Sequence, residues 1–183
     1  KTFTDLVISL PGRHQQINAA CALSAVMVLR ESGYDIPDNA VYTGLQNARW
    51  PGRLEQVMDK PVVILDGAHN PSGAAVLAET VRQYFSSKKI LLILGILRDK
   101  DVDKITETLC SIADRVTVTK SDNPRSLLPY ELAYIARKYH SDVNVFVNLK
   151  DAIADGLKWA QKSQDGDRML VISGSLYLIG NAR

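Results

Sequence analysis

The sequence predicts an α/β fold in which a mostly parallel sheet has helices on both faces. Five β-type runs alternate with helical patterns between residues 62 and 180, an order typical of parallel strands joined by crossover helices. The runs at 62–65 and 90–94 are apolar at every position, as strands buried on both faces must be. The composition, 46% apolar and 23% charged over 183 residues, is that of an ordinary globular chain.

The region before this alternation follows a different pattern. Residues 6–10 are predicted to form a strand that ends at Pro11-Gly12, and apolar residues at helical spacing predict an amphipathic or mostly buried helix over 14–31. A short helix over 38–45 follows. We therefore predict two unequal parts, with residues 1–47 the end of another domain and residues 48–183 a complete α/β domain.

Within the second part, residues 53–58 are expected to pair with 62–66 as a hairpin. The alternation then places the remaining elements. The predicted strands are 62–65, 90–94, 116–119, 143–147 and 169–172, and the predicted helices are 71–85, 102–112, 129–139, 151–161 and 176–180.

The charge balance gives little reason to expect a polyanionic partner. Lys and Arg number 22 against 20 Asp and Glu, so neither nucleic acid nor a membrane is expected to bind this chain. No apolar run approaches a membrane span, and the first residues do not resemble a signal peptide. We expect a cytoplasmic protein, with Cys21 and Cys110 as buried free thiols and no metal site in this chain.

The candidate binding residues follow the predicted strands, because ligands of open α/β sheets bind beyond the carboxyl ends of the strands. Asp66 directly follows a buried strand, where a carboxylate needs a partner. His69 lies in the same loop, and Asn70 can cap the next helix with Pro71 at its first position. A ligand site and a simple capped turn both remain open for this loop.

Two further loops lie at the same predicted edge. Ser173 and Ser175 flank Gly174 at the start of the last helix, which suits either an anion site or a simple N-cap. The charged residues 98–101 form either part of a site or a solvated turn. The sequence has no P-loop, no G-x-G-x-x-G after the first strand and no G-x-S-x-G, so spacing alone leaves the chemistry of this edge open.

Four segments in order resemble the C-terminal half of the folylpolyglutamate synthase and dihydrofolate synthase family, within the Mur ligase superfamily. The resemblance covers essentially the whole chain and implies a Rossmann-like C-terminal domain preceded by the end of a P-loop ATPase domain. The four segments are 12–18 (GRHQQIN), 50–55 (WPGRLE), 65–71 (LDGAHNP) and 172–180 (ISGSLYLIG).

The resemblance also implies an activity. Family members are ATP-dependent amide ligases, which phosphorylate a carboxylate so that the amine of L-glutamate can attack the acyl phosphate. By this resemblance Asn18 contacts the nucleotide, Arg53 is a catalytic residue at the phosphates, and Asp66 accepts from the ribose hydroxyls or helps to orient the nucleotide. His69, as a catalytic residue, and Ser173 with Ser175 would face the incoming glutamate.

The expected substrates are therefore ATP, L-glutamate and a folate or dihydropteroate, and the expected partner is the protein's own ATPase domain in a monomer. The P-loop and the Mg²⁺ ligands of the family belong to a segment absent from these 183 residues, so we expect the chain alone to be inactive and to bind ATP weakly. Another Mur-type amino-acid ligase and a non-catalytic binding module are the alternatives.

Overall fold

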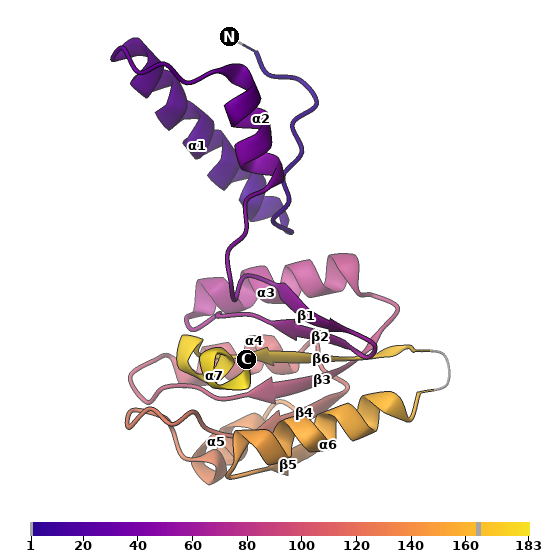
Figure 1. Cartoon of the computed structure of the whole chain (residues 1–183). Helices are drawn as coiled ribbons and strands as arrows, with labels where there is room; N and C mark the ends of the chain where they lie inside the picture. Colours follow the sequence, from indigo (N-terminus) through magenta and orange to yellow (C-terminus); the bar gives the residue numbers. More distant parts are fainter. Residues whose placement is uncertain (1, 164–165) are drawn as a thin grey trace. The chain divides into compact units, whose positions relative to one another are not determined.

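The computed structural model describes residues 2–163 and 166–183, and these divide into two compact units. The first unit ends at Pro51 and the second begins at Gly52 (Figure 1). This division lies slightly later than the 47/48 boundary expected from the sequence. Ala48 accepts a hydrogen bond from Ser9 Oγ at 2.5 Å, so the residues after the second helix are still attached to the first unit.

The first unit consists of two helices, α1 (Arg13–Glu31) and α2 (Asp38–Gln46). Both were predicted, but the predicted strand over 6–10 is wrong. The backbone N–H of Ser9 donates to the carbonyl of Leu45 at 3.3 Å, a residue of α2, and no described segment runs beside residues 6–10 as a strand. A strand needs such a partner to satisfy its backbone groups.

Helix α1 is far more exposed than its apolar pattern suggested. Gln15 and Ala19 are its buried residues, whereas Ile17 is 69% exposed and Val28 is 60% exposed. The prediction that Cys21 is buried is wrong for the same reason, because its thiol lies on this uncovered helix. The described residues of the first unit are too few to cover all sides of α1.

The second unit is built on a six-stranded sheet in the order β1-β2-β6-β3-β4-β5. Strand β1 runs antiparallel to β2, as the predicted hairpin required, and the other neighbours are parallel. The predicted fold class is therefore confirmed. The strands are β1 (Glu55–Asp59), β2 (Val62–Leu65), β3 (Lys89–Leu94), β4 (Arg115–Val118), β5 (Val143–Val145) and β6 (Arg168–Ser173).

Helices cover both faces of this sheet (Figure 1). Alternate residues of one strand enter two separate cores, so that Leu92 joins the core under α3, α4 and α5, while Leu91 joins the core under α6 and α7. This is the reason that the central strands are apolar throughout. The helices are α3 (Pro71–Tyr84), α4 (Val102–Cys110), α5 (Pro129–Ala136), α6 (Leu149–Gln161) and α7 (Leu176–Ala182).

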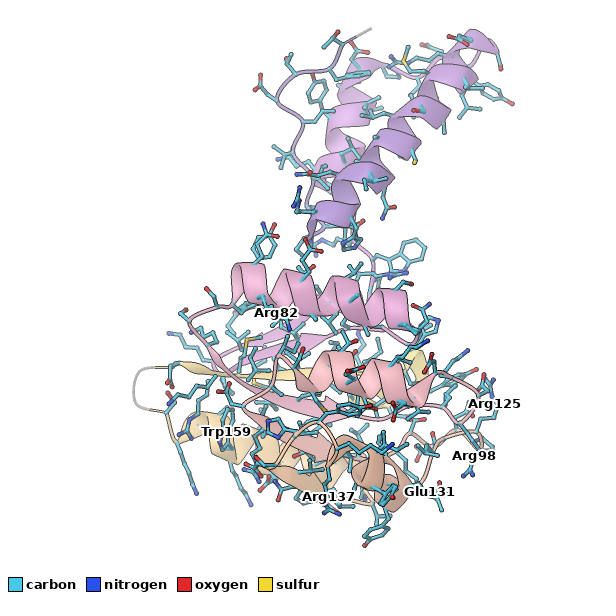
Figure 2. All side chains as sticks on the ribbon, turned by 180° about the vertical axis from the view of Figure 1, so that it is seen from behind. Arg82, Arg98, Arg125, Glu131, Arg137 and Trp159 are labelled. Carbon is cyan, nitrogen blue, oxygen red and sulfur yellow. The ribbon has the colours of Figure 1, made fainter. Side chains whose placement is uncertain are left out.

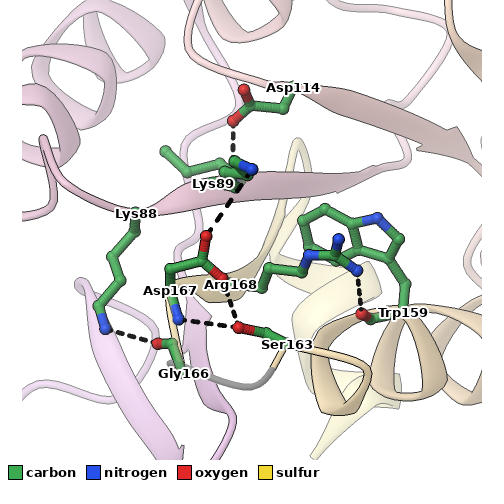
Figure 3. A network of polar contacts seen from close by, with 9 residues as sticks. Lys88, Lys89, Asp114, Trp159, Ser163, Gly166, Asp167 and Arg168 are labelled. Atoms are coloured by element: carbon green, nitrogen blue, oxygen red, sulfur yellow. Dashed lines mark hydrogen bonds and ion pairs between the residues drawn. The ribbon is translucent and has the colours of Figure 1, made fainter.

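A polar network holds the strands together at their amino ends (Figure 3). Asp167 accepts a hydrogen bond from the Ser163 hydroxyl and forms an ion pair with Lys89 at 3.8 Å. The Ser163 hydroxyl, together with Lys89, holds the pKa of Asp167 below its ordinary value. Arg168 stacks on the ring of Trp159 at 4.8 Å and donates to its carbonyl. These contacts join the end of α6 to the starts of β3 and β6.

The burial of β3 on both faces makes its side chains costly to remove. We expect Leu92→Ala, at a side chain with 0% exposure, to lower the free energy of unfolding by about 2–5 kcal/mol, because it leaves a cavity between sheet and helices. Val57→Ala is the matched control, since Val57 on edge strand β1 is 44% exposed. Urea denaturation measures both, and equal losses would contradict the two-face burial.

Candidate functional site

The loops that follow β2, β3 and β6 meet at the carboxyl edge of the sheet. These strands are neighbours, and the backbone contacts continue past their ends: Asp66 N–H donates to Ile172 at 3.1 Å, and Gly95 N–H donates to Ser173 at 3.2 Å. Gly174 has φ +106°, and a Cβ there would lie 2.8 Å from the Gly95 carbonyl oxygen. Only glycine permits this approach, so the predicted loops do form one surface.

The carboxylate of Asp66 is buried and each of its oxygens binds a backbone N–H. It is 9% exposed, and its Oδ1 accepts from Ala68 N–H at 2.9 Å while its Oδ2 accepts from Leu54 N–H at 2.8 Å. Asp66 thus connects the loop after β2 with the turn that precedes β1. Backbone N–H groups are therefore among the partners that the sequence required for a carboxylate in this position.

His69 projects from the same loop, and its ring contacts the backbone of that loop. Its Nδ1 lies 2.8 Å from the Gly67 carbonyl oxygen. Since a carbonyl only accepts, this contact requires the hydrogen on Nδ1, which leaves Nε2 of the neutral ring as an acceptor. The ring is half-buried. Asn70, as predicted, caps α3 through a 2.7 Å bond from Gly73 N–H.

Arg53 lies in the turn before β1, close in the chain to the Asp66 contact. The carbonyl of Gly52 accepts from Gly67 N–H at 2.8 Å, and Leu54 is bound to Asp66, so the backbone on either side of Arg53 is attached to the site loop. The Arg53 side chain is exposed, and within the described residues its guanidinium makes no hydrogen bond or ion pair. It is a cation available to an external anion.

The two predicted serines are covered. Ser175 is 2% exposed, and its hydroxyl caps α7 by accepting from Tyr177 N–H at 3.1 Å. Ser173 is 0% exposed, and its Oγ has no hydrogen-bond partner among the described residues. The capping alternative therefore describes Ser175 in this structure, and neither hydroxyl is presented to solvent.

Asn18 is the one predicted site residue that lies in the first unit. It lies on α1, its side chain is exposed, and its Nδ2 donates to Gln15 Oε1 at 2.9 Å. The remaining predicted site residues all lie in the second unit.

The charged residues after β3 form a surface cluster that the sequence left open. Arg98 pairs with Glu131 at 3.3 Å, and Arg125 pairs with Asp99 at 3.4 Å and lies over the Tyr177 ring at 5.9 Å. Figure 2 shows Arg98 and Arg125 together at the end of the sheet away from Trp159. These side chains are half exposed, so the pairs add little to stability.

Glu55 has no predicted role from the sequence, although it lies in the segment 50–55 (WPGRLE) that resembles the family. Its Oε2 accepts from Gly52 N–H at 2.8 Å and its Oε1 from Arg183 at 2.7 Å. A glutamate three residues after a turn glycine was the available signal. For a metal, the described part of the chain offers no group of three His, Cys, Asp or Glu side chains, and none of its helices is long and apolar enough to cross a membrane.

Because each oxygen of Asp66 accepts from a backbone N–H, loss of one oxygen should lower the stability of the protein. In Asp66→Asn one oxygen is replaced by an NH₂ group that faces a backbone N–H, so a buried donor loses its partner and the free energy of unfolding falls by about 1–3 kcal/mol. Asp59→Asn is the control, because Asp59 is exposed and its amide could still accept from Gln56. Urea denaturation compares the two, and an unchanged Asp66 variant would show that the carboxylate does not hold these loops.

Comparison with known proteins gives a consistent result. The chain is 35% identical, over all of its length, to the dihydrofolate synthase/folylpolyglutamate synthase of Bacillus subtilis, of which it spans 41%. It superimposes on the Mycobacterium tuberculosis folylpolyglutamate synthase complexed with ADP with a TM-score of 0.90 at 35% identity, covering 98% of this chain and 41% of that one.

A more distant structure is the Escherichia coli FolC protein in complex with DHPP and ADP, with a TM-score of 0.84 at 26% identity, covering 98% of this chain and 40% of that one. Residues 52–176 match the family described as Mur ligase, glutamate ligase domain. Since this match covers more than half of the sequence, the chain belongs to the Mur ligase family and contains its glutamate ligase domain.

Proposed function

We propose that the chain is the carboxyl-terminal part of an ATP-dependent, ADP-forming ligase that joins L-glutamate to a folate or dihydropteroate. The observation that carries this proposal is the similarity of the whole chain to folylpolyglutamate and dihydrofolate synthases. The site supports it, because an unpaired arginine, a buried carboxylate and a histidine acceptor lie on adjoining loops of the second unit. The chain spans 41% of the Bacillus subtilis relative, so the activity is proposed for the whole protein.

The proposed reaction has two steps. The γ-phosphoryl group of ATP passes to the carboxylate of the folate substrate, and the amine of L-glutamate then attacks the acyl phosphate, so that a C–N bond forms and phosphate leaves. Negative charge on the phosphoryl oxygens must be balanced during transfer. Arg53 would supply one positive charge there, since a planar guanidinium binds phosphate oxygens in a bidentate manner.

The other residues would orient the reactants. Asp66, which binds the backbone on both sides of the site through its two oxygens, would accept from the ribose hydroxyls of the nucleotide or help to orient it, as a carboxylate at a strand end does in related folds. The contact of Nδ1 with the Gly67 carbonyl would leave Nε2 of a neutral His69 ring to take a proton from the attacking amine of glutamate. For Ser173 and Ser175, contact with glutamate stays a prediction that requires movement of the covered loop.

The first unit is proposed to be the end of the ATPase domain, as residues 1–47 were interpreted from the sequence. Its exposed apolar side chains, such as Ile17 and Val28, suit a helix that other parts of a larger domain cover. Asn18 would contact the nucleotide from this domain. The ligands of Mg²⁺ are proposed to lie in the part of the protein outside these 183 residues. A cytoplasmic location and a monomeric state also stay predictions.

The activity is tested with the full-length protein, ATP, Mg²⁺ and a reduced folate or dihydropteroate, by measuring ADP release with and without L-glutamate. Release that depends on both acceptor and glutamate is the expected result. Release with another acid and amino acid would favour a different Mur-type ligase, and no release with any pair would favour a non-catalytic module. The 183-residue chain alone is expected to release no ADP.

Arg53→Ala in the full-length protein tests the phosphate role. Removing a cation that acts on transferring phosphoryl oxygens should lower kcat by about 10²–10³-fold, with a much smaller change in the KM for glutamate. The control is Arg137→Ala, because Arg137 lies at the end of α5 and contacts the carbonyl of Val143. Steady-state ADP release measures both variants. An effect on the KM for glutamate alone would contradict the assignment of Arg53 to phosphate.

A further inference from the structure

We propose that Glu55 is a positioning residue, whose carboxylate holds the turn of residues 52–55 of the second unit and thereby fixes the place from which Arg53 acts. The inference rests on the proposed role of Arg53 in phosphoryl transfer. Its basis is the pattern of contacts around Arg53, because the residues on both sides of it are held by carboxylates.

The two neighbours of Arg53 are bound in the same way. Gly52, before it, donates its N–H to Glu55 Oε2 at 2.8 Å, and Leu54, after it, donates its N–H to Asp66 Oδ2 at 2.8 Å. The Gly52 carbonyl accepts in turn from Gly67 N–H at 2.8 Å. The backbone of Arg53 is therefore attached to the site at both ends, while its side chain remains exposed.

The conformation of this turn needs such support. Gly52 has φ +73° and Leu54 has φ +45°, and a left-handed conformation is unfavourable for a leucine unless its surroundings hold it. Gly52 also lies against α7, since a Cβ at this position would be 2.5 Å from Ile179 Cδ1. The turn is consequently held in one conformation by hydrogen bonds and by packing.

Glu55 is itself fixed. It is the first residue of β1 and lies opposite Leu65 in the ladder with β2. Its side chain is 21% exposed, and Arg183, at the end of α7, donates to Oε1 at 2.7 Å. One carboxylate thus links the turn, the start of β1 and the end of α7. Loss of this carboxylate would leave the buried N–H of Gly52 without its acceptor.

The test compares Glu55→Ala with Glu55→Gln in the full-length protein. In Glu55→Ala we expect kcat to fall about 10- to 100-fold, because a displaced catalytic group loses efficiency steeply, with little change in the KM for glutamate. Glu55→Gln keeps an oxygen for Gly52 N–H and should retain most of the activity. Asp155→Ala is the control, because it breaks a comparable ion pair with Arg115 at 3.1 Å, outside the site, and should leave kcat unchanged.

A double variant separates positioning from general stability. If Glu55 acts through Arg53, Glu55→Ala introduced into Arg53→Ala should lower kcat by less than about twofold, since residues that act as a unit are not additive. A full multiplicative loss in the double variant, or normal kcat in Glu55→Ala while Arg53→Ala is slow, would overturn the inference.

Limited trypsin digestion reports on the turn independently of activity. Cleavage after Arg53 requires the turn to open, so we expect it to be at least tenfold faster in Glu55→Ala than in Glu55→Gln or Asp155→Ala. Unchanged cleavage would overturn the inference. Faster cleavage in Glu55→Ala combined with normal kcat in Arg53→Ala would instead overturn the proposed role of Arg53, because the turn would be held as described without serving the reaction.

Discussion

The hydrogen bonding of one buried carboxylate organises the candidate site. Asp66 follows an apolar strand, in a place that water reaches poorly, so each of its oxygens must find a donor inside the protein. The donors are backbone N–H groups on two different segments, Leu54 and Ala68. Meeting this requirement brings the turn that contains Arg53 against the loop that contains His69.

The parallel sheet explains why this occurs at one edge. Strands β2, β6 and β3 are neighbours that run in the same direction, so the loops after them emerge together. Glycines allow these loops to touch through their backbones, as at Gly174 beside Gly95. The site therefore has a frame of backbone contacts, on which exposed side chains such as Arg53 can meet external groups. The amino ends of the strands carry a separate network around Asp167.

The two units differ in how completely they bury their own apolar side chains. The second unit buries both faces of its sheet under helices. The first leaves Ile17 and Val28 of α1 exposed, although their spacing in the sequence is that of a covered helix. This contrast agrees with the chain spanning only 41% of the Bacillus subtilis relative, and it supports the proposal that α1 belongs to a larger domain.

The sequence by itself determined the fold class, the order of strands and helices along the chain of the second unit, the cap at Asn70 and the loops that form the edge, whereas the order of the strands within the sheet came from the structure. These depend on local apolar patterns and on the general behaviour of parallel strands. It failed for residues 6–10 and for Cys21, because a strand needs a partner and a buried thiol needs covering side chains. Only the tertiary structure showed that Asp66 binds the N–H of Leu54 on another segment, and it decided between the two alternatives for Ser175 in favour of the cap on α7. The contact between Asp66 and Leu54 joins a side chain and a backbone group on separate segments, and their distance and direction are set by the packing of those segments, which no local pattern records.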